Sequence, residues 1–386
     1  MVALGEVAEI VGGGTPKSGV EEYWNGDVPW ATPKDLSQLD GHYITKTPRN
    51  ITANGLANSS AALLPTNSVL FSSRAPIGHV AINTVPMATN QGFKTVVPRE
   101  GVSHSKYLFH WLRANRRFME SLGNGATFKE VSKATVSKVE IPLPPLPEQR
   151  RIAAILDHAD ALRSKRREAL AHLDELTQSI FIDMFGDPVV NPHDIASRPL
   201  TEIGHLYSGG TPSKGEASNW IGELPWFSPK DLKEDDLFDS QDHIDAGIPD
   251  RTNLRLLPAK TVAFVVRGMI LAHSFPVSVL QVPGTINQDL KAVLNPSVDP
   301  VFLAYCLRSQ AGHALAQVST AAHGTKKLDA EGMRQIGILV PGVSQQLEFT
   351  KRIVGLTELR GQHHTALAEL DALFASLQSR AFRGEL

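Results

Sequence analysis

Two long stretches of the chain place apolar residues at alternating spacings of three and four, the heptad pattern of a helix that packs along one narrow seam. The first stretch covers residues 148–184 and the second covers residues 345–382. The apolar positions are Ile152, Ile155, Ala159, Leu162, Ala169, Leu173, Leu176 and Ile180 in the first, and Phe349, Leu356, Leu359, Ala366, Leu370, Leu373 and Leu377 in the second. Such narrow stripes favour two long helices that pack on each other as a coiled coil. The alternative is that each helix covers the core of its own domain.

The sequence before each long helix has a mixed pattern. Gly, Pro and short β-like runs come first, such as residues 68–71 and 261–266, and a helical pattern follows at residues 106–119 and 301–315. A proline-rich break at residues 141–147 precedes the first long helix and favours an extended connection, and a lighter break precedes the second. This order predicts an α+β fold in which a domain with strands is followed, twice, by a long helix.

The two halves of the chain are copies of each other. Residues 4–36 align without a gap on residues 200–232, and fifteen of the 33 positions are identical, where chance gives roughly two. Both copies contain G-G-T-P and then W-x-G-x-x-P-W-x-x-P-K-D-L, and weaker similarity continues downstream. We therefore expect a first domain at residues 1–147, a helix at 148–186, a second domain at 187–343 and a helix at 344–386.

Composition and charge change this picture in one respect. The 386 residues carry a net charge of −2, which excludes a protein that holds nucleic acid by bulk positive charge alone. The charge is unevenly distributed, because residues 1–147 carry +3 and residues 187–343 carry −4, with seven acidic residues gathered in 234–250. Local basic patches therefore stay compatible with DNA binding in both copies.

The single cysteine, Cys306, excludes an intramolecular disulfide and a cysteine-based zinc cluster, and it fits a reducing cytoplasm. No stretch approaches 18 uninterrupted apolar residues, so we expect no membrane-spanning segment. Residues 12–18 read G-G-G-T-P-K-S, but Pro16 stands where a phosphate loop needs glycine, so a tight turn is the better interpretation. An enzyme such as a nuclease or a glycan-acting protein is less favoured, since the matched acids Asp35 and Asp231 lack a second matched acid.

Candidate DNA-contacting residues are polar side chains that recur at matching places in the copies or lie near the Gly-rich turns. Such residues are suited to contact a phosphate or a base. They are Lys17, Arg74, Gln91, Lys94, Lys129, Lys133, Lys214, Arg267, Gln288, Lys291, Lys326 and Lys327. Taken singly, each also fits a solvated surface residue. No metal site is expected, because the histidines are scattered without ligand spacing.

These motifs resemble the specificity subunit of type I restriction-modification systems. Members of that family repeat a target-recognition domain followed by a long helix, twice in one chain. The domains begin with the G-G-T-P and W-x-G-x-x-P-W segments, and they later carry R-x-P-I-G, N-Q-G-F and a proline run that ends in E-Q. The first copy shows these at residues 74–78, 90–93 and 142–149. The second copy departs from them, because residues 267–270 read R-G-M-I and residues 287–290 read N-Q-D-L.

The resemblance implies a protein without chemistry of its own that binds double-stranded DNA. One recognition domain would read each half of an asymmetric target, and the helices would form an antiparallel coiled coil that acts as a spacer. Two methyltransferase subunits that use S-adenosylmethionine to modify adenine are implied as partners, with motor-nuclease subunits for restriction. No cofactor is expected in this chain. A standalone bivalent DNA-binding protein without enzyme partners is the alternative.

Overall fold

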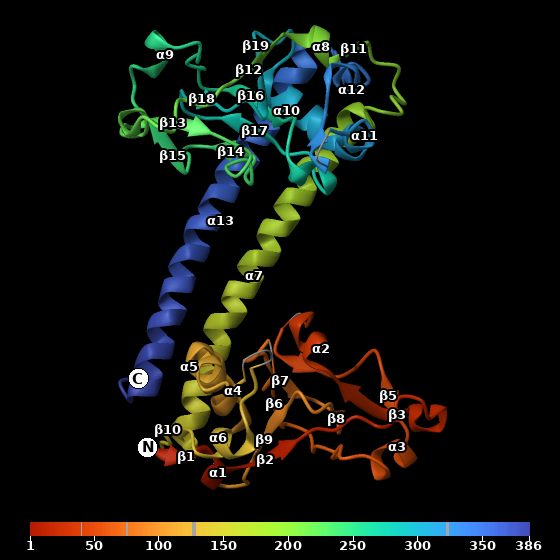
Figure 1. Ribbon diagram of the computed structural model, residues 1–386, viewed down its shortest axis with the longest axis vertical. Coiled ribbons are helices and arrows are strands. Elements are labelled where there is room, and N and C mark those ends of the chain that lie inside the picture. The colour runs from red at the N-terminus through yellow and green to blue at the C-terminus, as the bar shows by residue number, and fades with distance from the viewer. Residues whose placement is uncertain (40, 75, 126–128, 322–323) are drawn as a thin grey trace. The chain divides into compact units, whose positions relative to one another are not determined.

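The computed structural model describes residues 1–39, 41–74, 76–125, 129–321 and 324–386, so Ala75 of the R-x-P-I-G stretch lies outside the described residues. The chain forms two compact units. The first unit consists of Met1–Arg167 and Thr365–Leu386, and the second consists of Glu168–His364. Each unit contains a sheet-based domain and a segment of both long helices (Figure 1). The predicted α+β fold with two such domains is confirmed.

The first unit is built on a five-stranded sheet with the order β2-β9-β6-β7-β4, beside a three-stranded sheet with the order β5-β3-β8. Most neighbouring strands are antiparallel, but β4 pairs with β7 and β3 pairs with β8 in parallel. The first strand, β1, pairs with β10 just before the first long helix. The bounds are β1 Val2–Ala3, β2 Ala8–Gly12, β3 Trp24–Ala31, β4 Tyr43–Ile44, β5 Asn50–Ile51, β6 Val69–Phe71, β7 Val80–Asn83, β8 Ala88–Thr89, β9 Lys94–Pro98 and β10 Glu140–Ile141.

Short helices accompany these sheets. They are α1 Leu4–Val7, α2 Pro33–Ser37, α3 Ala53–Ala57, α4 Ser105–Ala114, α5 Arg116–Ser121 and α6 Lys133–Ser137. Helix α4 buries Leu108 and Leu112 against sheet residues such as Phe71 and Ile82. The same core includes Ile152 of the first long helix, so burial of apolar area joins the recognition domain to that helix.

The second unit repeats this architecture strand for strand. Its sheets have the orders β12-β19-β16-β17-β14 and β15-β13-β18, and β11 pairs with β22. The bounds are β11 Ser197–Pro199, β12 His205–Ser208, β13 Leu224–Phe227, β14 Asp236–Leu237, β15 Asp242–Ile244, β16 Thr261–Val265, β17 Val277–Leu280, β18 Thr285–Ile286, β19 Leu290–Leu294 and β22 Gly337–Leu339. A further hairpin pairs β20 (Ser319–Thr320) with β21 (Lys326–Lys327). The helices are α8 Leu200–Ile203, α9 Ile248–Arg251, α10 Pro300–Ser309, α11 Ala311–Ala316 and α12 Ala330–Arg334.

The helical patterns predicted at residues 106–119 and 301–315 are wrong in one respect, because each forms two helices and not one. The break falls at Asn115 in the first unit and at Gln310 in the second, where φ and ψ leave the helical region. Both side-chain amides donate to the carbonyl oxygen four residues earlier, Asn115 to Trp111 at 2.9 Å and Gln310 to Cys306 at 3.0 Å. The side chain of Gln310 replaces the backbone donor to that carbonyl oxygen, whereas the side chain of Asn115 shares the carbonyl oxygen of Trp111 with its own backbone N–H, which donates at 3.0 Å.

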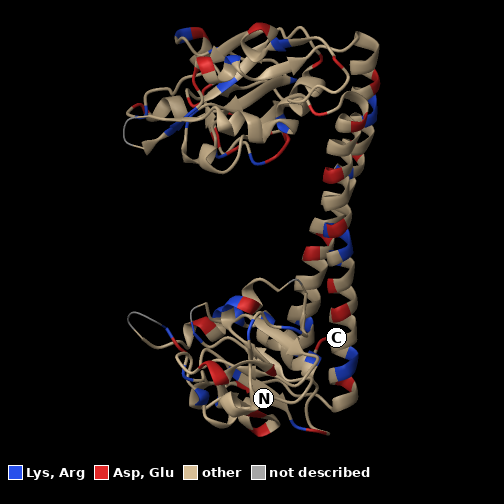
Figure 2. Ribbon diagram, turned by 90° about the vertical axis from the view of Figure 1, so that its right-hand side faces the viewer, with Lys and Arg blue, Asp and Glu red and all other residues tan. Residues whose placement is uncertain are grey.

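The two long helices are α7 (Leu146–Phe185) and α13 (Val343–Arg383), which start and end within two residues of the predicted stretches. Helix α7 begins earlier than predicted because Pro147 stands in its first turn, where a missing N–H costs no intrahelical bond. Charged residues of both signs are spread along both helices (Figure 2). No helix among the described residues is both long and apolar enough to cross a membrane.

Within the second unit the helices run antiparallel. Asp174 of α7 pairs with Arg360 of α13 at 3.1 Å, and farther along α7 the ring of Phe185 packs on Phe349 with centroids 5.6 Å apart. Residue numbers therefore rise along α7 in the direction in which they fall along α13. In the first unit, Arg163 of α7 binds Asp371 of α13.

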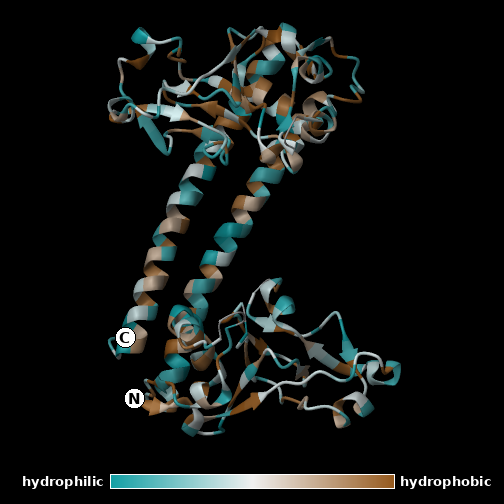
Figure 3. Cartoon of the chain, in the orientation of Figure 1, coloured by the Kyte–Doolittle hydropathy of each residue, from teal (hydrophilic) through white to brown (hydrophobic). Residues whose placement is uncertain are grey.

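The 3-4 spacing predicts a seam of two columns of residues along each long helix, and one of these columns is wrong. Leu162 and Leu176 of α7 are 42% and 45% exposed, and Leu359 and Leu373 of α13 are 40% and 50% exposed. The positions one residue later lie inward instead, and those that are buried are Leu156, Leu170, Thr177, Ile353, Phe374 and Ala381. Hydrophilic and hydrophobic residues accordingly alternate along both helices (Figure 3).

Polar residues in the seam explain this error. Arg163 and Arg360 occupy the inward column with side chains only 14% and 15% exposed. A pattern of apolar residues alone assigns arginine to the surface and leucine to the seam. Here the aspartates across the seam compensate the buried guanidinium groups, so the inward column accepts arginine.

Candidate nucleic-acid interface

The G-G-T-P segments are anchored in the same way in the two units. The indole N–H of Trp30 donates to the carbonyl oxygen of Gly14, and that of Trp226 donates to Gly210, both at 2.9 Å. Gly13 has no room for a side chain, because the carbonyl oxygen of Asn90 occupies the place of a Cβ atom. The G-G-T-P segment is therefore a structural element packed on a tryptophan, and the predicted turn follows directly after it, where the amide of Val20 donates to Lys17 at 3.2 Å.

Each G-G-T-P segment also hydrogen-bonds a glutamine that the sequence predicts to contact DNA. The hydroxyl of Thr15 hydrogen-bonds the side-chain oxygen of Gln91, and the hydroxyl of Thr211 donates to that of Gln288 at 2.6 Å. Both glutamines are exposed. The contact engages the amide oxygen and orients the amide group at the surface, which is the form in which glutamine can read a base edge.

Two of the predicted cations in the first unit meet at one carboxylate. Glu130 accepts Arg74 Nε at 2.7 Å and Lys94 Nζ at 3.0 Å. Burial alone would raise the pKa of Glu130, but the hydrogen bonds from Lys94 and Arg74 outweigh it and leave the pKa below its ordinary value. Glu130 is thus ionised at neutral pH, and it was not among the residues predicted from the sequence.

The corresponding cations of the second unit have other partners. Lys291 Nζ donates to the hydroxyl of Ser208 at 2.8 Å, and Lys326 Nζ donates to the hydroxyl of Thr320 at 2.9 Å. Arg267 and Lys327 lie on neighbouring backbone segments that form an antiparallel bridge. The structure therefore brings the backbones of Arg267 and Lys327 together, and Lys291 lies two residues after Asp289, whose carbonyl oxygen accepts from the Arg267 amide at 3.2 Å. Among the other predicted residues, the side chains of Lys17, Lys129, Lys133 and Lys214 are exposed.

A surface hollow of about 500 Å³ joins two of the predicted residues in the first unit. Arg74 and Gln91 line it together with Lys34, which precedes Asp35 of α2. In the second unit the equivalent of Lys34 is Lys230, which forms an ion pair with Asp242 at 2.6 Å. Sequence reasoning missed Lys34 as a candidate, since its neighbour Asp35 favours a structural role.

Arg49 is a second residue that the sequence did not indicate. Its guanidinium lies 3.9 Å from the ring centroid of Trp24 and 5.0 Å from that of Trp30. The strand registers place Arg49 where the second unit has Asp242, because Pro29 pairs with Asn50 and the equivalent pair in that unit lies one residue after Asp242. The first unit thus has a stacked cation where the second has an acid.

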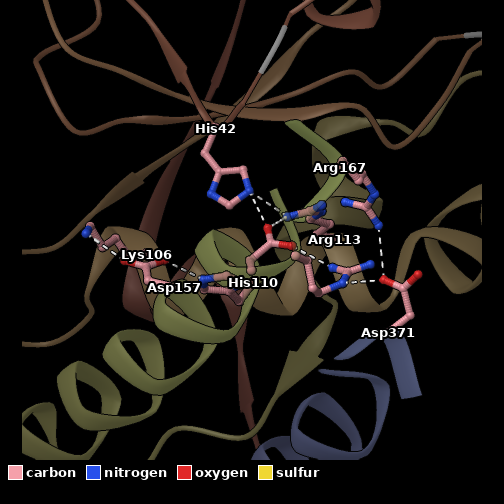
Figure 4. A network of polar contacts seen from close by, with 9 residues as sticks. His42, Lys106, His110, Arg113, Asp157, Arg167 and Asp371 are labelled. Atoms are coloured by element: carbon pink, nitrogen blue, oxygen red, sulfur yellow. Dashed lines mark hydrogen bonds and ion pairs between the residues drawn. The ribbon is translucent and has the colours of Figure 1, made fainter. Parts of the chain in front are cut away.

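The recognition domain of the first unit is tied to α7 by a network of charged groups (Figure 4). Asp160 of α7 binds His42 and Arg113 at 2.6 Å each, and it also binds Arg163. Burial alone would raise the pKa of Asp160, but the bonds and charges of His42 and Arg113 hold it far below its usual range. One turn earlier, Asp157 accepts a hydrogen bond from the fully buried His110.

The second unit has an equivalent junction, but its carboxylate comes from the recognition domain and not from the long helix. Asp235, which precedes β14, binds Arg308 at 3.3 Å and Arg360 of α13 at 3.1 Å. Asp235 stands where the first unit has His42, since the amides of Val279 and Ile82 donate to their respective carbonyl oxygens at 2.8 Å. Thr357 stands at the position of Asp160 in α13, so the acid belongs to the domain in the second unit and to the helix in the first.

A buried glutamine begins each long helix. Gln149 accepts a hydrogen bond from the His104 amide at 2.9 Å and donates to Val102 and Pro144. Gln346 makes the equivalent bonds, from the Asp299 amide at 2.7 Å and to Pro341 at 2.8 Å. This explains the E-Q end of the proline run: the glutamine satisfies backbone groups where the domain meets the helix.

Two solved structures share this duplicated fold along almost the whole chain. One is a chain in a structure of the type I R-M system, with a TM-score of 0.58 and 19% identity, covering 100% of this chain and 97% of that one. The other is the S subunit of a type I restriction-modification system from M. genitalium, with a TM-score of 0.61 and 14% identity, covering 99% and 95%. The fold is therefore that of the two-domain S subunits.

Sequence relatives identify the family. Residues 1–172 match the model of the type I restriction modification DNA specificity domain. The MjaIX specificity subunit of Methanocaldococcus jannaschii is 30% identical over 321 residues, 78% of this chain and 74% of that protein. The EcoR124I/EcoR124II specificity subunit of Escherichia coli is 29% identical over 250 residues, 62% of this chain and 60% of that protein. The chain belongs to the family of type I restriction enzyme specificity subunits, and the resemblance seen in its sequence motifs is confirmed.

Proposed function

We propose that this chain reads the DNA sequence for a type I restriction-modification complex, with one recognition domain on each half of an asymmetric double-stranded target. The observation that carries the proposal is the duplication within a chain of this family. The same sheets, turns and surface glutamines occur twice, and the charged residues around them differ. Two similar but non-identical binding units fit a target with two different halves.

In this proposal the recognition domains are residues 1–147 and 187–343, and residues 148–186 and 344–386 are spacer helices. The side chains that contact DNA are Lys17, Arg74, Gln91, Lys94, Lys129, Lys133, Lys214, Arg267, Gln288, Lys291, Lys326 and Lys327. Lysine and arginine supply phosphate contacts that position the domain on the duplex. The amide groups of Gln91 and Gln288 suit the N6 and N7 atoms of adenine.

The chain supplies recognition, and partner subunits supply chemistry. Two methyltransferase subunits, which use S-adenosylmethionine to modify adenine, dock on the long helices, and motor-nuclease subunits complete the restriction complex. The exposed leucines support two equivalent docking surfaces. The first unit exposes Leu162 and Leu373, and the second exposes Leu359 and Leu176, which are their equivalents 197 residues away in the repeat. Exposed apolar groups outside the seam are suited to bury area against a partner.

Genome-wide mapping of methylated adenines tests this function. Cells that express the chain with its methyltransferase should carry a two-part methylated sequence that is absent without the chain. Exchange of residues 1–147 for another recognition domain should change one half of that sequence only, and a change in both halves would contradict independent reading. If the chain purifies without any methyltransferase and methylation does not depend on it, the standalone DNA-binding alternative replaces the proposal.

A further inference from the structure

Backbone hydrogen bonds align three positions of the two recognition domains. The amide of Val131 donates to Ser73, and the amide of Leu328 donates to Val266, both at 2.9 Å. The preceding residues, Glu130 and Lys327, are therefore equivalent, and so are the residues that follow the two acceptors, Arg74 and Arg267. Their bridges agree, because Arg74 pairs with Glu130 and Arg267 pairs with Lys327.

The third position is Lys94 of β9 and Lys291 of β19, which lie at matching places opposite β2 and β12. In the first unit the three side chains converge, since Glu130 contacts both Arg74 and Lys94 within 3.0 Å. The fold thus directs three side chains to one place. Two cations and an acid meet there in the first unit, and the equivalent positions of the second unit carry three cations.

Little compensates the three cations of the second unit. Within the part of the chain that the structure describes, Arg267, Lys291 and Lys327 form no ion pair with a carboxylate. The nearest acids along the chain are Asp289 and Asp329, each two residues from one of the lysines. The carboxylate of Asp289 accepts from the side-chain amide of Asn287 at 3.3 Å, and that of Asp329 accepts from the backbone N–H of Gly332 at 3.0 Å. Burial lowers the pKa of Lys291, whose ammonium donates to the neutral hydroxyl of Ser208.

We propose that Arg267, Lys291 and Lys327 form a phosphate-binding site for the DNA backbone, and that Glu130 weakens the equivalent site of Arg74 and Lys94 in the first unit. The inference rests on the proposed function and adds that the two domains bind the DNA backbone with different strength at this site. One phosphate group of the DNA backbone can occupy this site, because its oxygens accept hydrogen bonds from several cations at once. The second domain therefore binds a phosphate strongly at this site although its net charge is −4. The first domain depends more on its other DNA contacts.

Two charge reversals that each copy the other unit test this site. In Lys327→Glu the new carboxylate can pair with Arg267 and Lys291 as Glu130 does, and in Glu130→Lys the first unit gains the cation set of the second. Each arrangement already exists in one unit, so both variants should fold. Lys351→Glu, at an exposed position of α13, is the control with the same change in charge.

The assay measures binding of the full-length chain to a mixed-sequence duplex of about 30 base pairs by fluorescence anisotropy at several salt concentrations. Lys327→Glu should weaken binding about tenfold and reduce the salt slope by about one, and Glu130→Lys should strengthen binding and increase the slope by about one. Equal behaviour of Lys327→Glu and Lys351→Glu would overturn the site while leaving the proposed function intact. If the wild-type chain does not bind the duplex, the proposed function itself fails.

Discussion

The junction between the first recognition domain and α7 allows a quantitative test. Asp160 has a side chain only 7% exposed and carries the bonds to His42, Arg113 and Arg163. Asp160→Thr, which copies Thr357 of the second unit, removes the carboxylate and leaves two guanidinium groups beside a neutral residue. We expect a large loss of stability in the first unit.

The exposure of the partners sets the size of this loss. Removing one partner of a fully buried pair costs about 3–5 kcal/mol. Arg113 keeps access to water with a side chain 38% exposed, and Arg163 keeps its bond to Asp371. These two features reduce the expected cost to about 2–3 kcal/mol, which is about a 30- to 150-fold change in an equilibrium constant.

The second unit also suggests a second substitution that should restore the stability lost in Asp160→Thr. In His42→Asp combined with Asp160→Thr, the acid moves from the helix to the domain, as Asp235 provides it in the second unit. The double variant should recover at least half of the stability lost by Asp160→Thr. His42→Asp alone should not stabilise the unit, because it places a second carboxylate beside Asp160.

Amide hydrogen exchange resolves the two units within one chain. Exchange of α4 amides reports opening of the first unit, and it should accelerate about 30- to 150-fold in Asp160→Thr. Exchange of α10 amides in the second unit is the internal control and should not change. The reasoning is refuted if Asp160→Thr accelerates α4 exchange less than about threefold, or if the double variant exchanges as fast as Asp160→Thr.

Three further predictions concern pH, the seam and the spacer. Burial lowers the pKa of His110 against the opposing bond to its aspartate, so the unfolded chain binds a proton that the folded unit does not. Stability of the first unit should therefore fall as pH drops below about 6.5, and His110→Gln, unlike the exposed control His172→Gln, should flatten this dependence in denaturant titrations. A double-mutant cycle on Arg163 and Asp371 should give a coupling energy of about 1–2 kcal/mol and a smaller value for the exposed ion pair of Arg151 with Glu148, and equal values would contradict a compensating pair in the seam. One extra heptad at matching points of α7 and α13 adds about 10 Å, so mapped methylation sites should gain about three base pairs between their halves, and an unchanged spacing would exclude a ruler.

The sequence predicts the large features of this protein well because they repeat. The aligned copies indicate two domains, and the 3-4 spacing indicates both long helices to within two residues of their ends. It misassigns one column of the seam, because apolar periodicity cannot reveal that Arg163 and Arg360 lie inward. Their burial depends on aspartates that come from the partner helix, and such pairing exists only after folding.

The candidate interface is less predictable for a related physical reason. Arg74 and Lys94 recur as Arg267 and Lys291, so matching the copies finds the cations. Matching does not find Glu130, since its equivalent Lys327 has the opposite charge, and a search for shared residues discards such a position. A difference at equivalent sites carries the information about specificity, whereas identity between the copies reports the turns and tryptophans that hold the fold.

The same distinction limits how the recognition domains can be exchanged. Each buried seam arginine is compensated by an aspartate across the seam and by a second acid at the junction, and this second acid belongs to the helix as Asp160 or to the domain as Asp235. The requirement is for one carboxylate between the two arginines of the junction, and either side can meet it. A domain of the second type joined at residue 147 to the first helix would bring its own aspartate against Asp160, and like charges at that distance repel in a buried site. An exchange of residues 1–147 is therefore sound only when the incoming domain has a neutral or basic residue at the place of His42, or when Asp160→Thr accompanies it.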